Sequence, residues 1–385
     1  MKNPQDAVDL QFEAINEDVP GLKWRRMFDR HWPAFRQWYV RQGVLPGPTS
    51  SACHTALRKH MPKLLPTYEA IIETAGGGDL EARFLSMWRP PFYMNGCSQA
   101  LVTGAEPSLI RNYDYSPHLL QGTWLASRFN GKRVVAMVDF LWGVLDGINE
   151  DGLAVSLAFG GSIVTGVGFG MPIVLRYVLE FADTTAAAVA MLRSIPVHMS
   201  YSIAVIDRKG NHATVYVNPN SPAEVVERRV STNHQHEVEW KDHAEMTNSI
   251  EREVAVEKLL HASASTETVV CGFQIPPIFQ THYSLKCGTL YTAVYRPLDA
   301  SVELVWPGSV WRQSCAEFQD GVRTLRWRRP GGSRLKLRGS LALRRDRSVT
   351  PCAGTASSQK SSSDRQHRGA ACTAGRAYET LSKEV

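Results

Sequence analysis

The chain has 385 residues, 43% of them hydrophobic and 21% charged, which provides enough apolar side chains for a sizeable core. Residues 321–385 hold 15 Lys and Arg against 4 Asp and Glu, so the formal charge of +6 arises in this segment and the preceding residues are mildly acidic. The sequence has neither an apolar run of about eighteen residues nor an apolar segment at its start, which excludes a membrane span and predicts a soluble, cytoplasmic protein.

Residues 1–96 are predicted to form a helical region. Aromatic and basic residues occur together over residues 23–40, and a second helix is expected over about residues 56–74. Such a mixture is also typical of a nucleic-acid or membrane face, but we expect the aromatic side chains to pack on the rest of the protein. Pro90 and Pro91 force extended chain, so the Gly96–Cys97 peptide is predicted to lie in a strand or loop.

Residues 97–320 have the pattern of short strands separated by turns. The segments rich in β-branched and aromatic residues are 123–129, 133–140, 153–159, 201–207, 213–218, 225–233, 289–296 and 302–306. Hairpin turns are predicted at residues 130–131, 151–152 and 209–211. Helices are expected over residues 173–181, 185–192 and about 245–260, with Thr184 or Thr185 as an N-cap. This order predicts an α+β protein whose helices cover packed antiparallel sheets.

The periodic pattern ends near Gly321. Few large apolar residues follow Leu343, and a segment of this kind cannot offset the entropy that it loses on ordering. We therefore predict three regions, which are a helical region over residues 1–96, a catalytic domain over residues 97–320 and a basic, disordered tail over residues 321–385.

The clearest chemistry lies at Gly96-Cys97. Seven scattered cysteines without a CxxC pair give no support to a disulfide framework or a zinc ribbon, and a reducing compartment would keep a catalytic thiol usable. If the Gly96–Cys97 peptide is cleaved, Cys97 gains an α-amine with a pKa of about 7.7–8.0, a base matched to its own thiol. Until then the amine is masked and the chain inactive. The simpler alternative is that Cys97 is a small buried core residue.

Two further segments carry candidate site residues. Arg111 and Asp114 follow Cys97 after a short hairpin. We expect Asp114 to orient the α-ammonium and Arg111 to hold the thiolate or a substrate carbonyl, although such a pair is often only a surface ion pair. Asn233 follows a predicted strand and is a candidate donor to a tetrahedral oxyanion, although an Asn in this place is more often a turn residue.

Four segments occur in an order that resembles a known family. They are residues 96–99, 111–115, 146–155 and 232–234. Together they are similar to the penicillin acyltransferase and choloylglycine hydrolase group of N-terminal-nucleophile enzymes, and most similar to its acyltransferase branch. The resemblance extends from about residue 80 to 318 and includes residues 288–292 and 306–308.

The resemblance implies an αββα four-layer sandwich preceded by a helical propeptide, with autocatalytic cleavage between Gly96 and Cys97. It implies that Cys97 is the nucleophile and attacks a linear amide or an acyl thioester. Arg111 matches the residue that the family places on the substrate side, and Asp114 matches the residue that orients the α-amine. Asn233 matches the oxyanion donor, and Arg252 matches a later active-site arginine. No cofactor and no metal are expected.

Three other features bear on specificity. Bile-salt hydrolases have a second oxyanion Asn where this chain has Ser156-Leu157-Ala158-Phe159, so a backbone donor is expected and bile-salt specificity is not. The glycines of residues 166–170 lack the full dinucleotide fingerprint and are expected in a loop that borders the substrate pocket. His234 and His236 would share a strand face, but no third metal ligand is evident.

The sequence therefore predicts a self-processing cysteine amidohydrolase or acyltransferase. Its expected partner is a small-molecule acyl amide or acyl thioester rather than nucleic acid, and an oligomer is compatible with the sequence. Two alternatives remain open, which are an enzyme that is not processed and a non-catalytic binding protein on the same scaffold.

Overall fold

The computed structural model describes residues 7–41, 47–262, 265–283 and 288–328. Two β-sheets form the centre of the described residues. The larger has the strand order β10-β9-β8-β7-β6-β5-β4-β1-β15, and the smaller has the order β11-β2-β3-β12-β13-β14. Neighbouring strands are antiparallel except for β1 and β4, which are parallel.

The strands of the larger sheet are β1 (Ala7–Asn16), β4 (Thr123–Ser127), β5 (Val134–Asp139), β6 (Gly143–Asn149), β7 (Ala154–Phe159), β8 (Tyr201–Ile206), β9 (His212–Asn218), β10 (Ser221–Val226) and β15 (Gly321–Arg328). Those of the smaller sheet are β2 (Gly96–Val102), β3 (Ser108–Tyr115), β11 (Val230–Ser231), β12 (Gly288–Arg296), β13 (Ser301–Trp306) and β14 (Ser309–Ser314). A short 3₁₀ helix, η3 (Pro117–Leu119), precedes β4.

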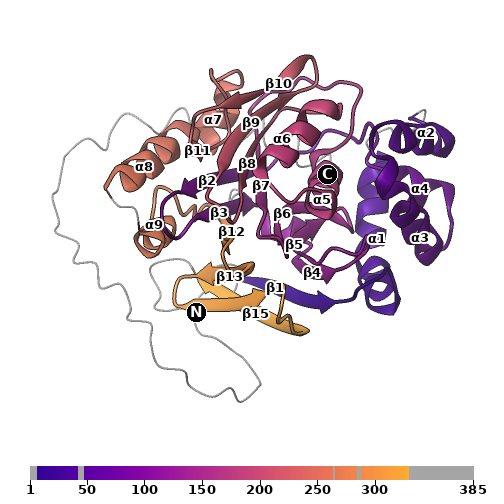
Figure 1. Cartoon of the computed structure of the whole chain (residues 1–385), viewed down its shortest axis with the longest axis horizontal. Coiled ribbons are helices and arrows are strands. Elements are labelled where there is room, and N and C mark those ends of the chain that lie inside the picture. Colours follow the sequence, from indigo (N-terminus) through magenta and orange to yellow (C-terminus); the bar gives the residue numbers. More distant parts are fainter. Residues whose placement is uncertain (1–6, 42–46, 263–264, 284–287, 329–385) are drawn as a thin grey trace, which may run out of the picture.

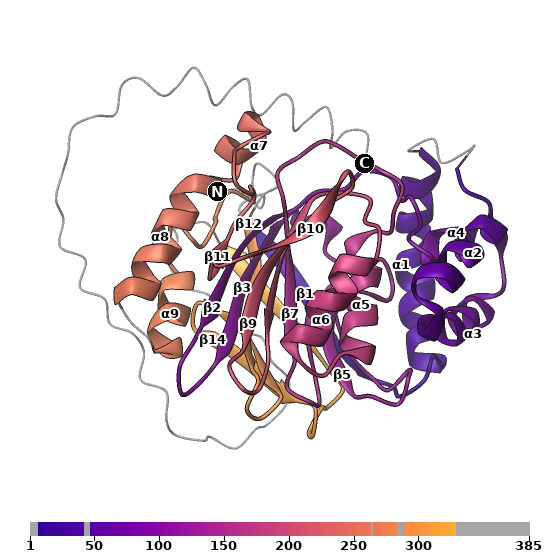
Figure 2. The same cartoon turned by 45° about the horizontal axis from the view of Figure 1, so that its top comes forward.

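Helices cover the outer faces of the two sheets. On the larger sheet lie α5 (Met171–Phe181) and α6 (Thr185–Ser194), which contact β6 to β10. On the smaller sheet lie α8 (Ser249–Ala262) and α9 (Thr266–Phe273), which contact β2 and β3 and are preceded by α7 (Lys241–Met246). Figures 1 and 2 show this order of layers. The predicted αββα sandwich is confirmed.

Central strands of both sheets are buried along their whole length because both of their faces are covered. One apolar cluster joins the two sheets to the N-terminal helices, and a second one lies between the smaller sheet and its helices. Ile110, Val256 and Phe273 belong to the second cluster and are fully buried. The predicted hairpin turns all join neighbouring strands, and Thr184 caps α6 by accepting a hydrogen bond from the Ala187 N–H.

The N-terminal region is only partly as predicted. It contains α1 (Leu22–Arg41), α2 (Ser50–His60), the 3₁₀ helix η2 (Pro62–Leu64), α3 (Leu65–Ala75) and α4 (Asp79–Leu85). The single helix expected over residues 56–74 is wrong, because the chain breaks at Pro62 into two helices. A helical reading of Ala7–Asn16 is also wrong. Leu10, Phe12 and Ala14 are buried while the residues between them are not, which is the period of a strand.

Two further predictions need correction at element boundaries. Gly321–Arg328 was expected to be disordered but forms β15, because β1 lies beside it as an antiparallel partner with Leu10 opposite Leu325. The rest of the predicted tail lies outside the described residues. The helix expected over residues 245–260 is divided into α7 and α8 at Asn248, whose φ of 50° lies in the left-handed region that Asn tolerates.

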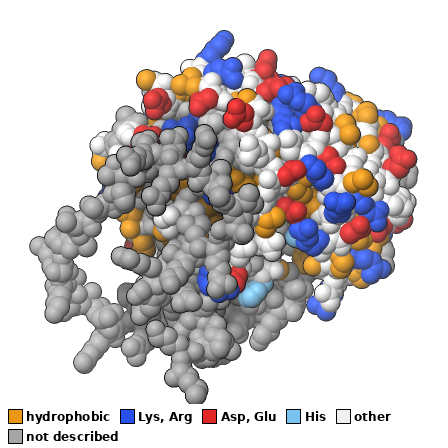
Figure 3. Space-filling view, turned by 90° about the horizontal axis from the view of Figure 1, so that it is seen from below, with side chains coloured by type: hydrophobic (Ala, Val, Ile, Leu, Met, Phe, Trp, Pro, Cys, Tyr) orange, Lys and Arg blue, Asp and Glu red, His pale blue; other side chains and the backbone are white. Residues whose placement is uncertain are grey.

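The aromatic side chains of α1 pack inward, as expected. Trp24 and Phe28 stack at 5.3 Å between ring centroids, Phe28 and Trp32 stack at 5.5 Å, and all three are buried. The indole N–H of Trp24 donates to the carbonyl of Leu141, 3.1 Å away. A nucleic-acid or membrane face made of these aromatic side chains is therefore excluded. In Figure 3, basic and acidic side chains are interspersed over the described part of the face seen from below.

Two observations bear on the cellular setting. Within the described ranges, no helix combines the length and apolar character needed to cross a membrane. Cys53, Cys97 and Cys315 are free and buried, whereas Cys271 is disulfide-bonded. The cysteine spacing gave no sign of the disulfide at Cys271.

Candidate active site

Cys97 is the second residue of β2 and is fully buried. The two prolines upstream exclude a helix there, and β2 pairs with β3 so that Gly96 lies opposite Asp114 and Cys97 opposite Tyr113. The Gly96–Cys97 peptide thus lies at the start of a strand, as predicted. Because pairing with β3 fixes the backbone of both Gly96 and Cys97, the Cys97 thiol is held close to the Gly96–Cys97 peptide bond.

Arg111 lies directly beside the thiol. Its Nη2 is 3.0 Å from the Cys97 Sγ, and its Nε donates to the carbonyl of Leu157 at 3.0 Å. Its Nη1 forms an ion pair with Asp146 and donates to the hydroxyl of Tyr291 at 3.0 Å. The guanidinium is fully buried, so its charge acts on the sulfur with little screening by water. Arg111 therefore favours the thiolate, as expected for the residue that holds it.

Burial has the opposite effect on the thiol. It raises the pKa of Cys97 to about 11, while the charges of Arg111 and Arg252 lower the pKa and that of Asp114 raises it. In the uncut chain at neutral pH, the sulfur is therefore mainly a neutral thiol. A weak hydrogen bond to the Oδ1 of Asn95, 3.6 Å away, gives that proton a partner.

Asn233 holds the backbone nitrogen of Cys97. Its Oδ1 accepts from the Cys97 N–H at 3.0 Å and from the Arg252 Nη2 at 2.6 Å. Its Nδ2 donates to the carbonyls of Asn95 and Phe159, at 3.3 and 3.2 Å. The structure therefore places the Asn233 side-chain carbonyl on the backbone nitrogen of Cys97, and the Asn233 amide donor on the carbonyls of Asn95 and Phe159. The oxyanion role stays a prediction.

Arg252 and Asp114 complete the group around Cys97. The Nη1 of Arg252 donates to the Cys97 carbonyl at 2.6 Å, to the Ser98 hydroxyl at 2.8 Å and to the Asp114 Oδ2 at 3.1 Å. The other Asp114 oxygen accepts from the Thr289 hydroxyl at 2.6 Å. Burial raises the pKa of Asp114, and the charge of Arg252 together with the Thr289 hydrogen bond lowers it. Arg252 bridges Asp114 and Asn233, so all five predicted site residues lie together.

The sequence analysis missed a buried carboxylate behind Arg111. Asp146 on β6 pairs with Arg111 and accepts hydrogen bonds from the hydroxyls of Tyr291, at 2.7 Å, and Tyr295. Asp146 is the first residue of the motif segment 146–155, and Tyr291 lies in the segment 288–292, but neither residue was assigned to the site. Tyr291 lies on β12, which pairs with β3 in the smaller sheet, whereas Asp146 meets Arg111 from β6 in the larger sheet, a contact that the local sequence cannot show.

Three other expectations can be placed. The hydroxyl of Ser156 donates to the side-chain carbonyl of Gln99, and the Gln99 amide in turn donates to the Ser202 carbonyl at 3.1 Å. The hydroxyl of Ser156 is therefore engaged by Gln99. His234 is buried against Glu253, whereas His236 is exposed and pairs with Glu224. The described residues hold no group of three or more His, Cys, Asp or Glu side chains arranged for a metal ion.

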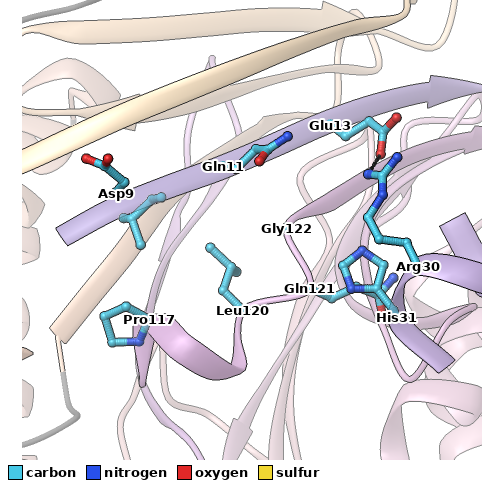
Figure 4. Close-up of a pocket in the computed structure, with 10 residues that line it drawn as sticks. Asp9, Gln11, Glu13, Arg30, His31, Pro117, Leu120, Gln121 and Gly122 are labelled. Carbon is cyan, nitrogen blue, oxygen red and sulfur yellow. Dashed lines mark hydrogen bonds and ion pairs between the residues drawn. The ribbon is translucent and has the colours of Figure 1, made fainter. Parts of the chain in front are cut away.

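A separate cavity of about 200 Å³ lies between β1, α1 and the segment before β4 (Figure 4). The carboxylates in its lining are paired, since Glu13 forms an ion pair with Arg30 and Asp9 forms one with Arg326 of β15. Gln121 in its wall accepts from the Leu141 N–H at 3.0 Å. None of the lining residues is a hydrogen-bond partner of Cys97. This cavity is therefore not the candidate active site.

Comparison with family models shows the family of this chain. The family model described as acyl-coenzyme A:6-aminopenicillanic acid acyl-transferase matches residues 102–311, which is more than half of the chain. No curated protein sequence matches the chain.

Similar solved structures include three enzymes. A mutant of conjugated bile acid hydrolase from Clostridium perfringens has a TM-score of 0.43 and 10% identity over 59% of this chain and 96% of that chain. Penicillin V acylase from Agrobacterium tumefaciens has a TM-score of 0.41 and 14% identity over 60% of this chain and 90% of that chain. The Caenorhabditis elegans ortholog of N-acylethanolamine-hydrolyzing acid amidase has a TM-score of 0.42 and 18% identity over 61% of this chain and 100% of that chain.

Proposed function

The chain belongs to the acyl-coenzyme A:6-aminopenicillanic acid acyl-transferase family, and from this membership we propose that it activates itself by cleaving the Gly96–Cys97 peptide. It is a hydrolase or acyltransferase with a cysteine nucleophile. One observation carries the proposal of self-cleavage. The thiol of Cys97 lies 3.0 Å from Arg111, and the nitrogen of the same residue lies 3.0 Å from the Asn233 carbonyl.

In the cleavage step the Cys97 thiolate attacks the Gly96 carbonyl carbon. The bond from that carbon to the Cys97 nitrogen then breaks, the nitrogen takes up a proton, and Gly96 is left as a thioester on the sulfur. Water hydrolyses the thioester and restores the thiol. Arg111 favours the attacking thiolate, and the Asn233 Oδ1 is placed to hold the nitrogen as it becomes an amine.

In turnover the α-amine of Cys97 takes the proton of its own thiol. The sulfur attacks the carbonyl of a linear amide or an acyl thioester, the amine or thiol leaves, and the acyl group passes to water or to an amine acceptor. The Asn233 Nδ2 now donates to Asn95, which precedes the cleavage site. Withdrawal of Asn95 after cleavage frees this N–H to donate to a substrate oxyanion, where one donor typically contributes about 10²–10³ in rate.

The substrate proposal is a small acyl donor. The name of the family points to acyl-coenzyme A as one donor to test, and linear N-acyl amides are the other class. Residues 1–96 would remain as a separate fragment. A cytoplasmic location stays a prediction from composition. The disulfide-bonded Cys271 argues against it, because disulfides persist in oxidising compartments, and fractionation of expressing cells decides between the two.

The test compares cleaved wild-type protein with Cys97→Ala and, as a matched control, Cys53→Ala. Cys53 is also free and buried, but it lies on α2. Release of coenzyme A or of amine is followed for a series of acyl-coenzyme A and N-acyl amide substrates. We expect turnover by wild type and the control and none by Cys97→Ala. Turnover by Cys97→Ala equal to wild type would contradict the proposal.

A further inference from the structure

A chain of buried polar side chains lies behind Asn233. The Asn233 N–H donates to the Ser249 Oγ at 2.8 Å, and the His234 Nδ1 lies 2.9 Å from the same Oγ. The His234 Nε2 lies 3.1 Å from the Glu253 Oε2. His234 and Glu253 are at most 8% exposed, and Ser249 is fully buried. Ser249 is therefore no second nucleophile, since it is inaccessible and its oxygen already binds the Asn233 backbone.

The charge arrangement orients the imidazole. Glu253 faces His234 from α8, and Arg228, which precedes β11, lies 3.1 Å from the other Glu253 oxygen, with Tyr216 beside it. Burial opposes ionisation of Glu253, but the hydrogen bond from His234 and the charges of His234 and Arg228 outweigh burial and lower its pKa. A charged Glu253 accepts a hydrogen bond from the Nε2–H of His234, which leaves Nδ1 to face Ser249.

This series of hydrogen-bonded side chains is connected to the candidate active site at both of its ends. Glu253 directly follows Arg252 on α8, and the Arg252 Nη2 lies 2.6 Å from the Asn233 Oδ1. The backbone of Asn233 is clamped on its other side as well, because a Cβ at Gly161 would come within 2.4 Å of the Asn233 carbonyl oxygen. Small movements of this segment therefore change the position of the Asn233 side chain relative to the Cys97 nitrogen.

We propose that His234 is a positioning residue, which links Glu253 to Ser249 and so holds Asn233 and Arg252 in register around Cys97. This inference rests on the proposed self-cleavage. Misplacing a reacting group by about 1 Å can cost about 10²-fold in rate. Loss of His234 should therefore slow the cleavage of Gly96–Cys97, although the imidazole nitrogens face Thr232, Ser249 and Glu253 rather than the cleaved peptide.

The test follows self-cleavage of the full chain after cell-free synthesis. The variants are H234A, H234N, which keeps a polar group near the Nδ1 position, and H234Q, which places one near Nε2. His236→Gln is the matched control, since His236 is exposed, pairs with Glu224 and packs edge-on against the ring of Tyr216, and within the described residues it has no hydrogen bond or ion pair with Ser249 or Glu253. Thermal unfolding and the rate of iodoacetamide alkylation of Cys97 in the cleaved protein are measured for every variant.

We expect H234A to cleave about 10–100-fold more slowly than wild type. In H234A the Ser249 oxygen keeps its contacts with the Asn233 N–H and the Thr232 hydroxyl but loses the one with His234. H234N should recover part of the loss because its amide replaces the Nδ1 contact with Ser249, and the control should cleave at the wild-type rate. Alkylation of Cys97 should change in parallel with cleavage. If H234A does not fold, H234N and H234Q decide the outcome.

Wild-type rates of cleavage and alkylation in the His234 variants would overturn the inference while self-cleavage stands. A second result would also overturn the inference. If the cleavage rate falls in proportion to thermal stability in every His234 variant, and H234N recovers nothing, His234 is a purely structural residue. A wild-type chain that never cleaves would instead overturn the proposed function, and the inference with it.

Discussion

At the scale of single residues, the buried thiol predicts how self-cleavage depends on pH. The pKa of Cys97 is raised to about 11, first by burial, so the thiolate fraction below that pH grows about tenfold per pH unit. We expect the cleavage rate to rise about tenfold per unit between pH 7 and 9, measured by intact mass after a pH jump. A rate that stays flat over this range would show that the thiolate does not limit the reaction.

Asp146 carries a second prediction at this scale. Asp146→Asn leaves the fully buried Arg111 without its ionised partner, and breaking a buried ion pair typically costs about 3–5 kcal/mol. We expect a loss of that size in the free energy of unfolding, measured in urea, together with slower cleavage.

Asp151→Asn is the control for this change. Asp151 pairs with Lys132 at 2.5 Å but is 41% exposed, so its loss should cost at most about 1 kcal/mol. Equal losses in the two variants would mean that the Arg111–Asp146 pair contributes no more than a surface ion pair.

Residue types and spacing made Cys97, Arg111, Asp114 and Asn233 candidates, the family resemblance added Arg252, and the structure brings all five together. The sequence could not show that Asn233 turns its carbonyl to the Cys97 nitrogen, since that depends on Arg252 donating to the same oxygen. Asp146 was missed as a site residue because a carboxylate in a strand segment gives no local sign of the arginine that it meets across two sheets.

At the scale of elements, the start of β2 requires a glycine. A Cβ at Gly96 would lie 3.0 Å from the Cβ of Asp114 on β3, so the two strands would have to move apart at the cleavage site. We expect Gly96→Ala to slow cleavage markedly.

Gly321→Ala, at the start of β15, is the matched control for Gly96→Ala. Its nearest contact would be a ring carbon of Trp311 at an ordinary 3.4 Å, so it should cleave like wild type. Both rates come from the ratio of intact to cleaved mass over time. Unchanged cleavage in Gly96→Ala would show that the position of β2 against β3 does not set the rate.

The strand β1 predicts what happens to the N-terminal fragment. It lies between β4 and β15 inside the larger sheet, and α1 inserts Trp24 into the core. We therefore expect residues 1–96 to stay bound after cleavage, so that the two fragments elute together in size-exclusion chromatography and separate only in denaturant. Release of the N-terminal fragment under native conditions would contradict this.

The elements that sequence patterns predicted well are those with local signals, such as the hairpins at residues 130–131 and 151–152 and the N-cap at Thr184. β1 and β15 were missed because each is stabilised by a strand far away in the sequence. Without knowledge of that partner, the basic residues of Gly321–Arg328 resemble a solvated tail.

At the scale of the whole molecule, the architecture follows from two facts that the sequence contains. Short β-rich segments alternate with helices, of which α5 and α6 cover the larger sheet and α8 and α9 the smaller one, while α1 to α4 form a third, N-terminal group. The family model, which covers residues 102–311, connects this architecture to acyl transfer. Cys97 is fully buried in the uncut chain, and Asn95 contacts both its thiol and the Asn233 amide. Which acyl group is used therefore depends on how the surroundings of Cys97 change after cleavage.

The central claim is that Cys97 becomes an N-terminal nucleophile. The most direct test is the intact mass of the purified protein with N-terminal sequencing of its fragments, for wild type and Cys97→Ala. The account predicts a wild-type fragment that begins Cys97-Ser98-Gln99 and a single 42.8 kDa chain for the variant. A wild-type chain that stays uncut over days at neutral pH, or a Cys97→Ala chain cut at the same bond, would contradict it.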